Sequence, residues 1–271
     1  PHSLKGAAEQ RDFAALGAED VIALRLRAEA LTEDNRLTEA ETALQKAVAL
    51  APDFALAWSD LGRVQRRQQR MVDAEASIRR FVALRPRDPD AHNQLGLLLF
   101  DVHQFAAAEA AFNTALGCRP DYADTFIYLG EVFARRRKLD LAEANYRRAL
   151  ELDPHSLLAH NRLAVLLTFR GQPAAAAALL EDVLSRHPDA EPIKLRLGGI
   201  WCEMGRLADA ERIAHEALAR SPKSVSAHSL LGRVQECLGD DAAAAEAYVA
   251  ALRLNQAWSS AWLGVIRMHR K

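Results

Sequence analysis

Proline recurs in this sequence at a fixed interval of 34 residues. Six of the ten prolines share this register, and Gln256 takes the next place in it: Pro52, Pro86, Pro120, Pro154, Pro188 and Pro222. Self-similarity at a fixed period is the sequence signature of a repeat protein. The period therefore predicts a linear array of structural repeats.

Other columns of residues repeat with the same period. One column is always alanine: Ala40, Ala74, Ala108, Ala142, Ala176, Ala210 and Ala244. Another is always small: Ala28, Gly62, Gly96, Gly130, Ala164, Gly198 and Gly232. Within a unit, apolar residues lie three and four positions apart, which is helical spacing. Because small residues let two helices approach closely and proline ends a helix, each unit is predicted to be a helical hairpin.

The columns resemble the tetratricopeptide repeat, whose signature combines an aromatic residue, a Leu-Gly pair and a later Ala and Pro. One unit carries the signature most fully, with Phe126, Leu129, Gly130, Ala142 and Pro154. The resemblance extends over most of the chain. It implies an all-α fold, an α-solenoid in which seven 34-residue helix-turn-helix repeats and terminal helices form a right-handed superhelix.

The repeat register divides the chain into three parts. Residues 1–20 are predicted to be an N-terminal capping segment, mainly helical, and residues 259–271 a C-terminal half-repeat helix. Between them, residues 21–258 form seven repeats: 21–54, 55–88, 89–122, 123–156, 157–190, 191–224 and 225–258. Trp262, Val265 and Ile266 on the last helix leave three alternatives open: self-association through this helix, further chain after it, or a cap with one inward apolar face.

Composition excludes several classes of function. Lys and Arg total 35 against 36 Asp and Glu, a net charge of −1, whereas nucleic-acid binding needs excess cations to match the phosphates. No apolar run approaches the roughly 20 residues of a membrane-spanning helix. Three cysteines without regular spacing indicate a reducing compartment rather than a disulfide framework. We therefore expect a cytoplasmic protein that binds neither nucleic acid nor membrane.

Two basic clusters occur, within residues 63–70 and at residues 135–138. Both lie where the first helix of a repeat is predicted to end. Because cations there complement the partial negative charge of the helix C-terminus, we interpret these clusters as structural.

The sequence contains no evident catalytic or metal-binding motif. It lacks a phosphate-binding loop, a serine nucleophile elbow and a helical zinc-protease pair. His92, His160 and His228 lie 68 residues apart, which places them roughly 20 Å apart at about 10 Å per helix layer. Zinc ligands lie about 2 Å from the ion. We therefore expect these histidines to pack helices, and we expect no metal, no cofactor and no catalysis by this chain.

In the family, the first helix of each repeat lines a concave groove. Units three to five place apolar residues on this non-core side, where polar residues would suffice, and such a patch is typical of a binding surface. Nearby asparagines can bond a peptide backbone, and arginines suit an acidic group. The predicted peptide-binding residues are Asn93, Leu97, Phe100, Ile127, Tyr128, Asn161, Arg162, Val165, Phe169 and Arg196. The alternative is that these residues pack on one another.

The resemblance thus implies a protein–protein interaction scaffold that binds an extended or helical peptide segment in its groove. A second hypothesis comes from the style of the array, which is bacterial-like and similar to arrays that precede glycosyltransferase or sulfotransferase domains. In that case the chain is the substrate-recognition region of a larger transferase whose catalytic domain lies outside it. The two hypotheses differ in function but predict the same fold.

Overall fold

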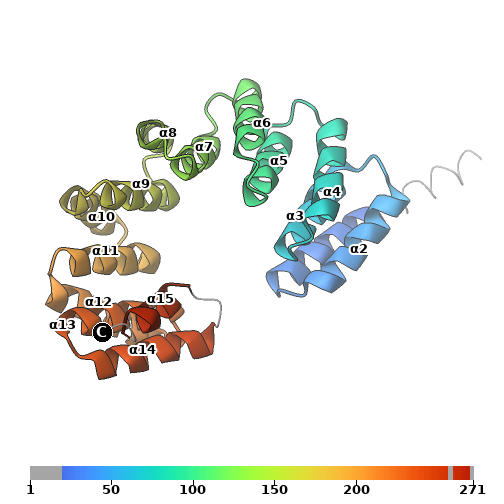
Figure 1. Ribbon diagram of the computed structural model, residues 1–271. Helices are drawn as coiled ribbons and strands as arrows, with labels where there is room; N and C mark the ends of the chain where they lie inside the picture. The colour runs from blue at the N-terminus through green and yellow to red at the C-terminus, as the bar shows by residue number, and fades with distance from the viewer. Residues whose placement is uncertain (1–19, 256–258, 269–271) are drawn as a thin grey trace, which may run out of the picture. The chain divides into compact units, whose positions relative to one another are not determined.

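The computed structural model describes residues 20–255 and 259–268. Within these residues every regular element is an α-helix (Figure 1). A helical segment at 20–33 leads into α2 (Leu37–Leu50). The prediction of an all-α helical-repeat fold is therefore confirmed. Most of the predicted N-terminal capping segment, residues 1–19, lies outside the described residues.

After α2 the helices alternate between two kinds, which we call first helices and second helices. The first helices are α3 (Ala55–Arg67), α5 (Pro89–Asp101), α7 (Ala123–Arg135), α9 (Leu157–Phe169), α11 (Glu191–Glu203), α13 (Val225–Leu238) and α15 (Ser259–Met268). The second helices are α4 (Met71–Leu84), α6 (Phe105–Cys118), α8 (Leu139–Leu152), α10 (Pro173–Arg186), α12 (Leu207–Arg220) and α14 (Asp241–Leu254). Successive first helices begin 34 residues apart, which is the period of the prolines.

The chain forms two compact units, of which the first ends at Lys138 and the second begins at Leu139. In the first unit, α5 packs against its second helix α6 and also against the first helices α3 and α7. In the second unit, α11 packs against α12 and against the first helices α9 and α13. Within each unit, first helices therefore contact one another as well as their own second helices.

The helices pack through the two columns of small residues. Every member of the invariant alanine column is completely buried. A Cβ atom added to Gly96 would lie 2.5 Å from the ring of Phe112, so α5 and α6 can meet only because this position is glycine. In the sixth repeat the position that corresponds to Phe112 is Ala214. Leu230 of the next first helix fills the space there, 2.7 Å from a Cβ added to Gly198.

The turn between the two helices of each repeat has one fixed geometry. The same column has a positive φ in every repeat: Asn35, Gln69, His103, Arg137, Gly171, Gly205 and Gly239. The following N–H donates to the carbonyl five residues earlier, as Gln104 does to Leu99 at 2.8 Å. This is the Schellman end of a helix. A side chain in the left-handed region costs about 1–2 kcal/mol, and three of the seven positions avoid that cost with glycine.

Gly205→Ala is therefore expected to lower the free energy of unfolding by about 1–2 kcal/mol, because alanine disfavours the φ of +75°. Gly117→Ala is the control, since Gly117 lies in helix α6 and also has no neighbouring atom within 4 Å of an added Cβ. That change should stabilise the protein by about 0.5–1 kcal/mol. Urea denaturation checks both values, and effects of the same sign would contradict the backbone explanation.

Aromatic and histidine side chains fasten successive repeats together. Trp58 donates its indole N–H to the carbonyl of Pro52 at 2.9 Å. The imidazole Nε2 of His92 bonds Pro86 in the same way at 2.8 Å. His228 repeats the bond to Pro222, whereas His160 is buried and bonds the carbonyl of Ser156. These bonds give the histidines a structural role, and no group of potential metal ligands occurs in the part of the chain that the structure describes.

Candidate functional site

In the first unit, two of the predicted binding residues are buried. Asn93 is 4% exposed and Ile127 is 1% exposed. The Asn93 side-chain oxygen accepts a hydrogen bond from the hydroxyl of Thr125 on the next first helix, at 3.0 Å. The prediction that Asn93 and Ile127 present a binding surface is therefore wrong. Asn93 and Ile127 are buried because α5 and α7 contact each other. This contact covers part of the side of α5 and α7 that is turned away from the second helices.

The other three predicted residues of the first unit, Leu97, Phe100 and Tyr128, are half-buried. The ring of Tyr128 stacks on Phe112, with the centroids 5.5 Å apart, and burial raises the pKa of its hydroxyl. Phe100 contacts the edge of Phe105, with the centroids 5.6 Å apart. These aromatic residues therefore take part in packing and keep only part of their surface available to a ligand.

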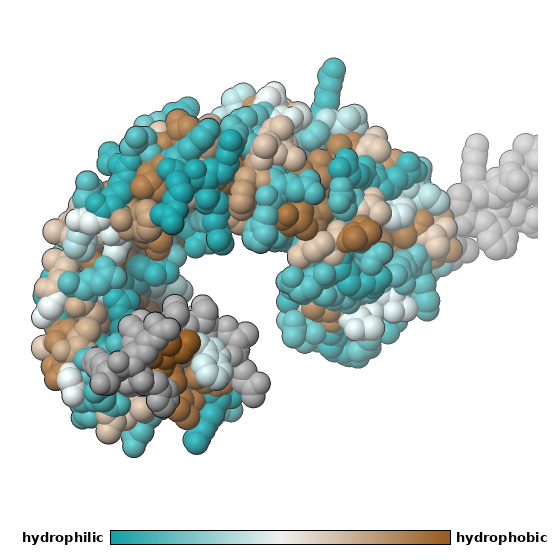
Figure 2. Space-filling model, viewed as in Figure 1, coloured by the Kyte–Doolittle hydropathy of each residue, from teal (hydrophilic) through white to brown (hydrophobic). Residues whose placement is uncertain are grey.

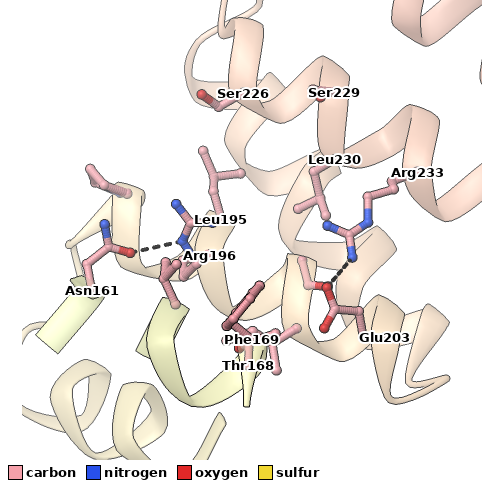
Figure 3. Close-up of a pocket in the computed structure, with 14 residues that line it drawn as sticks. Asn161, Thr168, Phe169, Leu195, Arg196, Glu203, Ser226, Ser229, Leu230 and Arg233 are labelled. Atoms are coloured by element: carbon pink, nitrogen blue, oxygen red, sulfur yellow. Dashed lines mark hydrogen bonds and ion pairs between the residues drawn. The ribbon is translucent and has the colours of Figure 1, made fainter. Parts of the chain in front are cut away.

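The second unit contains a hollow of about 620 Å³ between α9, α11 and α13 (Figure 3). Four predicted residues line it: Asn161, Val165, Phe169 and Arg196. The remaining lining residues are Thr168, Pro192, Leu195, Gly199, Ile200, Glu203, Ser226, Ser229, Leu230 and Arg233. Arg162, which was also predicted, is half-buried and is not part of this lining.

Several of the residues that line the hollow are apolar. Phe169 is 56% exposed and Val165 is 38% exposed. Ile200 and Leu230 belong to the same lining and are buried. Gly199 adds no side chain, and a Cβ atom added there would meet only one atom within 4 Å, a nitrogen of Arg233. This arrangement could enclose an apolar group of a ligand.

Polar side chains lie on either side of Phe169 in the view of Figure 3. Arg196 donates its Nε–H to the side-chain oxygen of Asn161 at 2.9 Å. Arg233 bonds a carboxylate oxygen of Glu203 at 3.0 Å and the carbonyl of Gly199 at 2.9 Å. Partial desolvation lowers the pKa of Arg196, and the nearby charges of Arg162 and Arg233 lower it further. The guanidinium still remains charged at neutral pH, because an arginine side chain does not lose its proton in proteins.

Helix α13 contributes residues to this hollow that were not among the predicted ones. Ser229 lies 68 residues after Asn161, and Leu230 lies 34 residues after Arg196. Both therefore belong to columns whose earlier members were predicted as binding residues. Continuing the column of Arg196 by one repeat would have found Leu230, and continuing the column of Asn161 by two repeats would have found Leu195 and Ser229. Gly199 also continues a predicted column, that of Leu97 and Val165, but only the structure shows how few atoms lie near it.

Several arginines of the two basic clusters have oxygen partners within the first unit. Each arginine of the cluster within residues 63–70 has an oxygen partner: Arg63 bonds Asp60, Arg66 bonds Asp101, Arg67 bonds the carbonyl of Thr32, and Arg70 bonds Glu41. In the second cluster, Arg136 pairs with Glu109. Hydrophilic residues cover much of the face drawn in Figure 2. The contacts support the structural interpretation of these charges.

Cys202, on α11 beside the hollow, should react far more slowly with an alkylating reagent than Cys118 and Cys237. Cys202 is buried whereas the other two thiols are exposed, and burial raises the pKa of Cys202 to about 11. The thiolate is the reactive form, so a raised pKa leaves less of it at pH 8. Peptide mass spectrometry after timed alkylation checks this order. If the slow phase of alkylation is lost in Cys202→Ser, that phase belongs to Cys202. Rapid labelling of Cys202 would contradict its burial.

None of the helices in the described part of the chain combines the length and the apolar character needed to cross a membrane.

Two family models match the sequence, and both are described as tetratricopeptide repeat. One matches residues 4–53, 25–89 and 93–157, and the other matches residues 133–196 and 167–234. No curated protein matches the chain.

Several solved structures share the fold. A tetratricopeptide repeat protein from Parabacteroides merdae superposes with a TM-score of 0.73 at 17% identity, over 93% of this chain and 99% of that one. A thermophilic repeat protein from Thermus thermophilus gives a TM-score of 0.60 at 21% identity, over 66% of this chain and 98% of its own. The pilF protein of Pseudomonas aeruginosa gives a TM-score of 0.60 at 16% identity, over 79% of this chain and 97% of its own. At these identities the likeness concerns the fold alone.

Proposed function

The chain belongs to the tetratricopeptide repeat family, and from this premise we propose that it binds an extended or helical segment of a partner protein in the hollow between α9, α11 and α13. Tetratricopeptide repeat proteins bind protein partners and act in general as interaction scaffolds. An array made of such repeats is typical of a non-catalytic scaffold. The proposal adds the place at which this chain holds its partner.

The observation that carries the proposal is the exposure of Phe169 at the edge of a preformed hollow. Burying such a side chain fully is worth about 1.5–3 kcal/mol, a gain that the free chain forgoes. The walls are helices that pack against neighbours on both sides, so most of the ordering cost of binding falls on the ligand. A short peptide segment suits these dimensions better than a folded domain.

In the first unit, we propose that the available surface of Leu97, Phe100 and Tyr128 provides further contacts for a partner. Their half-burial limits what each can contribute. Phe169 in the second unit is therefore the residue whose removal should weaken binding most.

The test is capture of proteins from a lysate of the source organism, with the chain as bait beside a Phe169→Ala, Arg196→Ala double variant. Val72→Ala serves as the matched control, because Val72 is an apolar residue on α4 that is 83% exposed. A partner held by the parent and by the control variant, and lost by the double variant, is the expected result. Equal capture by all three would place the binding surface elsewhere.

A second proposal concerns the last described helix. Trp262 and Ile266 of α15 are 49% and 44% exposed, which supports self-association through this helix. Light scattering over a range of concentrations tests it, and a constant monomer mass would contradict it.

The transferase hypothesis remains an alternative, in which the same hollow would select the protein substrate of a catalytic domain. The exposed thiols of Cys118 and Cys237 support a reducing compartment such as the cytoplasm.

A further inference from the structure

We propose that the hollow recognises an acidic–apolar peptide motif, in which a large apolar side chain sits above Gly199 and a neighbouring Asp or Glu pairs with Arg196. This inference rests on the proposed function, because it names the ligand class of the same site. It is carried by two separate features of the hollow, the open space above Gly199 and the charge around Arg196.

The open space is specific to one repeat. In the other repeats the column of Gly199 holds a side chain: Glu29, Arg63, Leu97, Glu131, Val165 and Arg233. A Cβ atom added to Gly199 would meet only one atom within 4 Å, a terminal nitrogen of Arg233 at 3.5 Å. Phe169 and Leu195 belong to the same lining. The missing side chain therefore leaves a space beside the Arg233 guanidinium, in a lining that also contains apolar side chains.

Packing does not explain this glycine. Its neighbour Gly198 is required, because an added Cβ there would lie 2.7 Å from Leu230. Gly199 has no such neighbour, and glycine within a helix is less favourable than alanine. A glycine without a packing role often marks the close approach of a ligand or another chain. We place the apolar side chain of the ligand above it.

The charge around the space calls for an acidic partner. Arg196 bonds the neutral amide of Asn161, and within residues 20–255 and 259–268 it forms no salt bridge. Glu203 is already paired with Arg233. The lining therefore carries one more positive than negative charge, from Arg196 and Arg233 against Glu203. A carboxylate would pair with Arg196 through charge-assisted hydrogen bonds. A basic or wholly apolar ligand would instead remove water from the guanidinium without supplying a negative partner, which costs free energy.

The size of the hollow fits this motif. A volume of about 620 Å³ lies within the range of roughly 300–1,000 Å³ that is typical of sites for small ligands. It can therefore take a few side chains of an extended segment. Ser226 also belongs to the lining, and a hydroxyl group can bond the backbone of such a segment.

The first experiment is selection from a displayed library of random peptides against the whole chain, followed by sequencing. The expected result is enrichment of peptides with a large apolar residue next to Asp or Glu. Enrichment of basic or uncharged peptides would overturn this inference while leaving the proposed function in place. Failure to enrich any peptide would contradict the proposed function itself.

The second experiment is a charge exchange with an enriched peptide. Arg196→Glu should weaken binding by roughly 10-fold or more, as expected for loss of a charge-assisted pair, and Lys in place of the acidic peptide residue should restore it. Arg253→Glu is the control, because Arg253 is exposed on α14 outside the hollow and its reversal changes the net charge equally. Equal weakening by both variants, or failure of the Lys peptide to restore binding, would overturn the assignment of Arg196.

Discussion

Phe112→Ala is expected to lower the free energy of unfolding by about 3–5 kcal/mol, as large-to-small changes of buried phenylalanine do. Phe112 is completely buried and occupies the space opposite Gly96, where α5 meets α6. Its ring also stacks on Tyr128 of the next first helix. The change therefore leaves a cavity at a point where three helices of the first unit meet. Urea denaturation followed by circular dichroism measures the loss.

A second substitution tests the explanation. Gly96→Ala alone should cost about 1–3 kcal/mol, because the new Cβ would lie 2.5 Å from the Phe112 ring. In the Phe112→Ala background that ring is absent, and the same change should be neutral or stabilising. Strictly additive effects of the two changes would show that the bulky and small columns do not depend on each other.

Gly199→Leu is expected to abolish peptide binding in the second unit while leaving the fold at least as stable. The leucine side chain would fill the space that we assign to the ligand. It would also replace a helical glycine, a change that favours the helix by up to about 1 kcal/mol. Loss of binding without loss of stability distinguishes a ligand site from a structural one. Fluorescence anisotropy with a selected peptide measures binding, and thermal denaturation measures stability.

Gly198→Leu provides the contrast at the adjacent position. There the added side chain would overlap Leu230, so the expected effect is a loss of stability of about 1–3 kcal/mol or more. The two variants differ by one residue in position and carry the same new side chain. If both destabilised the chain equally, the space above Gly199 would not be open in solution. If Gly199→Leu bound peptide normally, the ligand would not occupy it.

The fold could be predicted because its packing rule is local and repeats. A small residue such as Gly96 must face a bulky one such as Phe112 wherever two helices of a hairpin cross, and this need recurs every 34 residues. The period makes each column visible many times in one sequence. Even the departure at Ala214 keeps the rule, because Leu230 supplies the missing volume from the next helix.

The candidate site could be predicted only in part, because a first helix packs on three sides. Hydrophobic periodicity separates the side that faces the second helix from the rest, but it does not show which remaining positions face a neighbouring first helix. Ile127 and Phe169 were both predicted to lie on the groove side, yet one is 1% exposed and the other 56%. Gly199 departs from its column in the sequence, but only the structure shows that few atoms of neighbouring residues lie near it.

The central claim is that a peptide segment binds between α9, α11 and α13, and hydrogen exchange of the chain with and without a selected peptide tests it most directly. Backbone amides of helices that line a bound ligand exchange more slowly, since binding stabilises the folded state locally. The account predicts added protection in α9, α11 and α13, and no such change in Gly199→Leu at the same peptide concentration. Protection confined to the second helices α10 and α12, or equal protection in the variant, would contradict it.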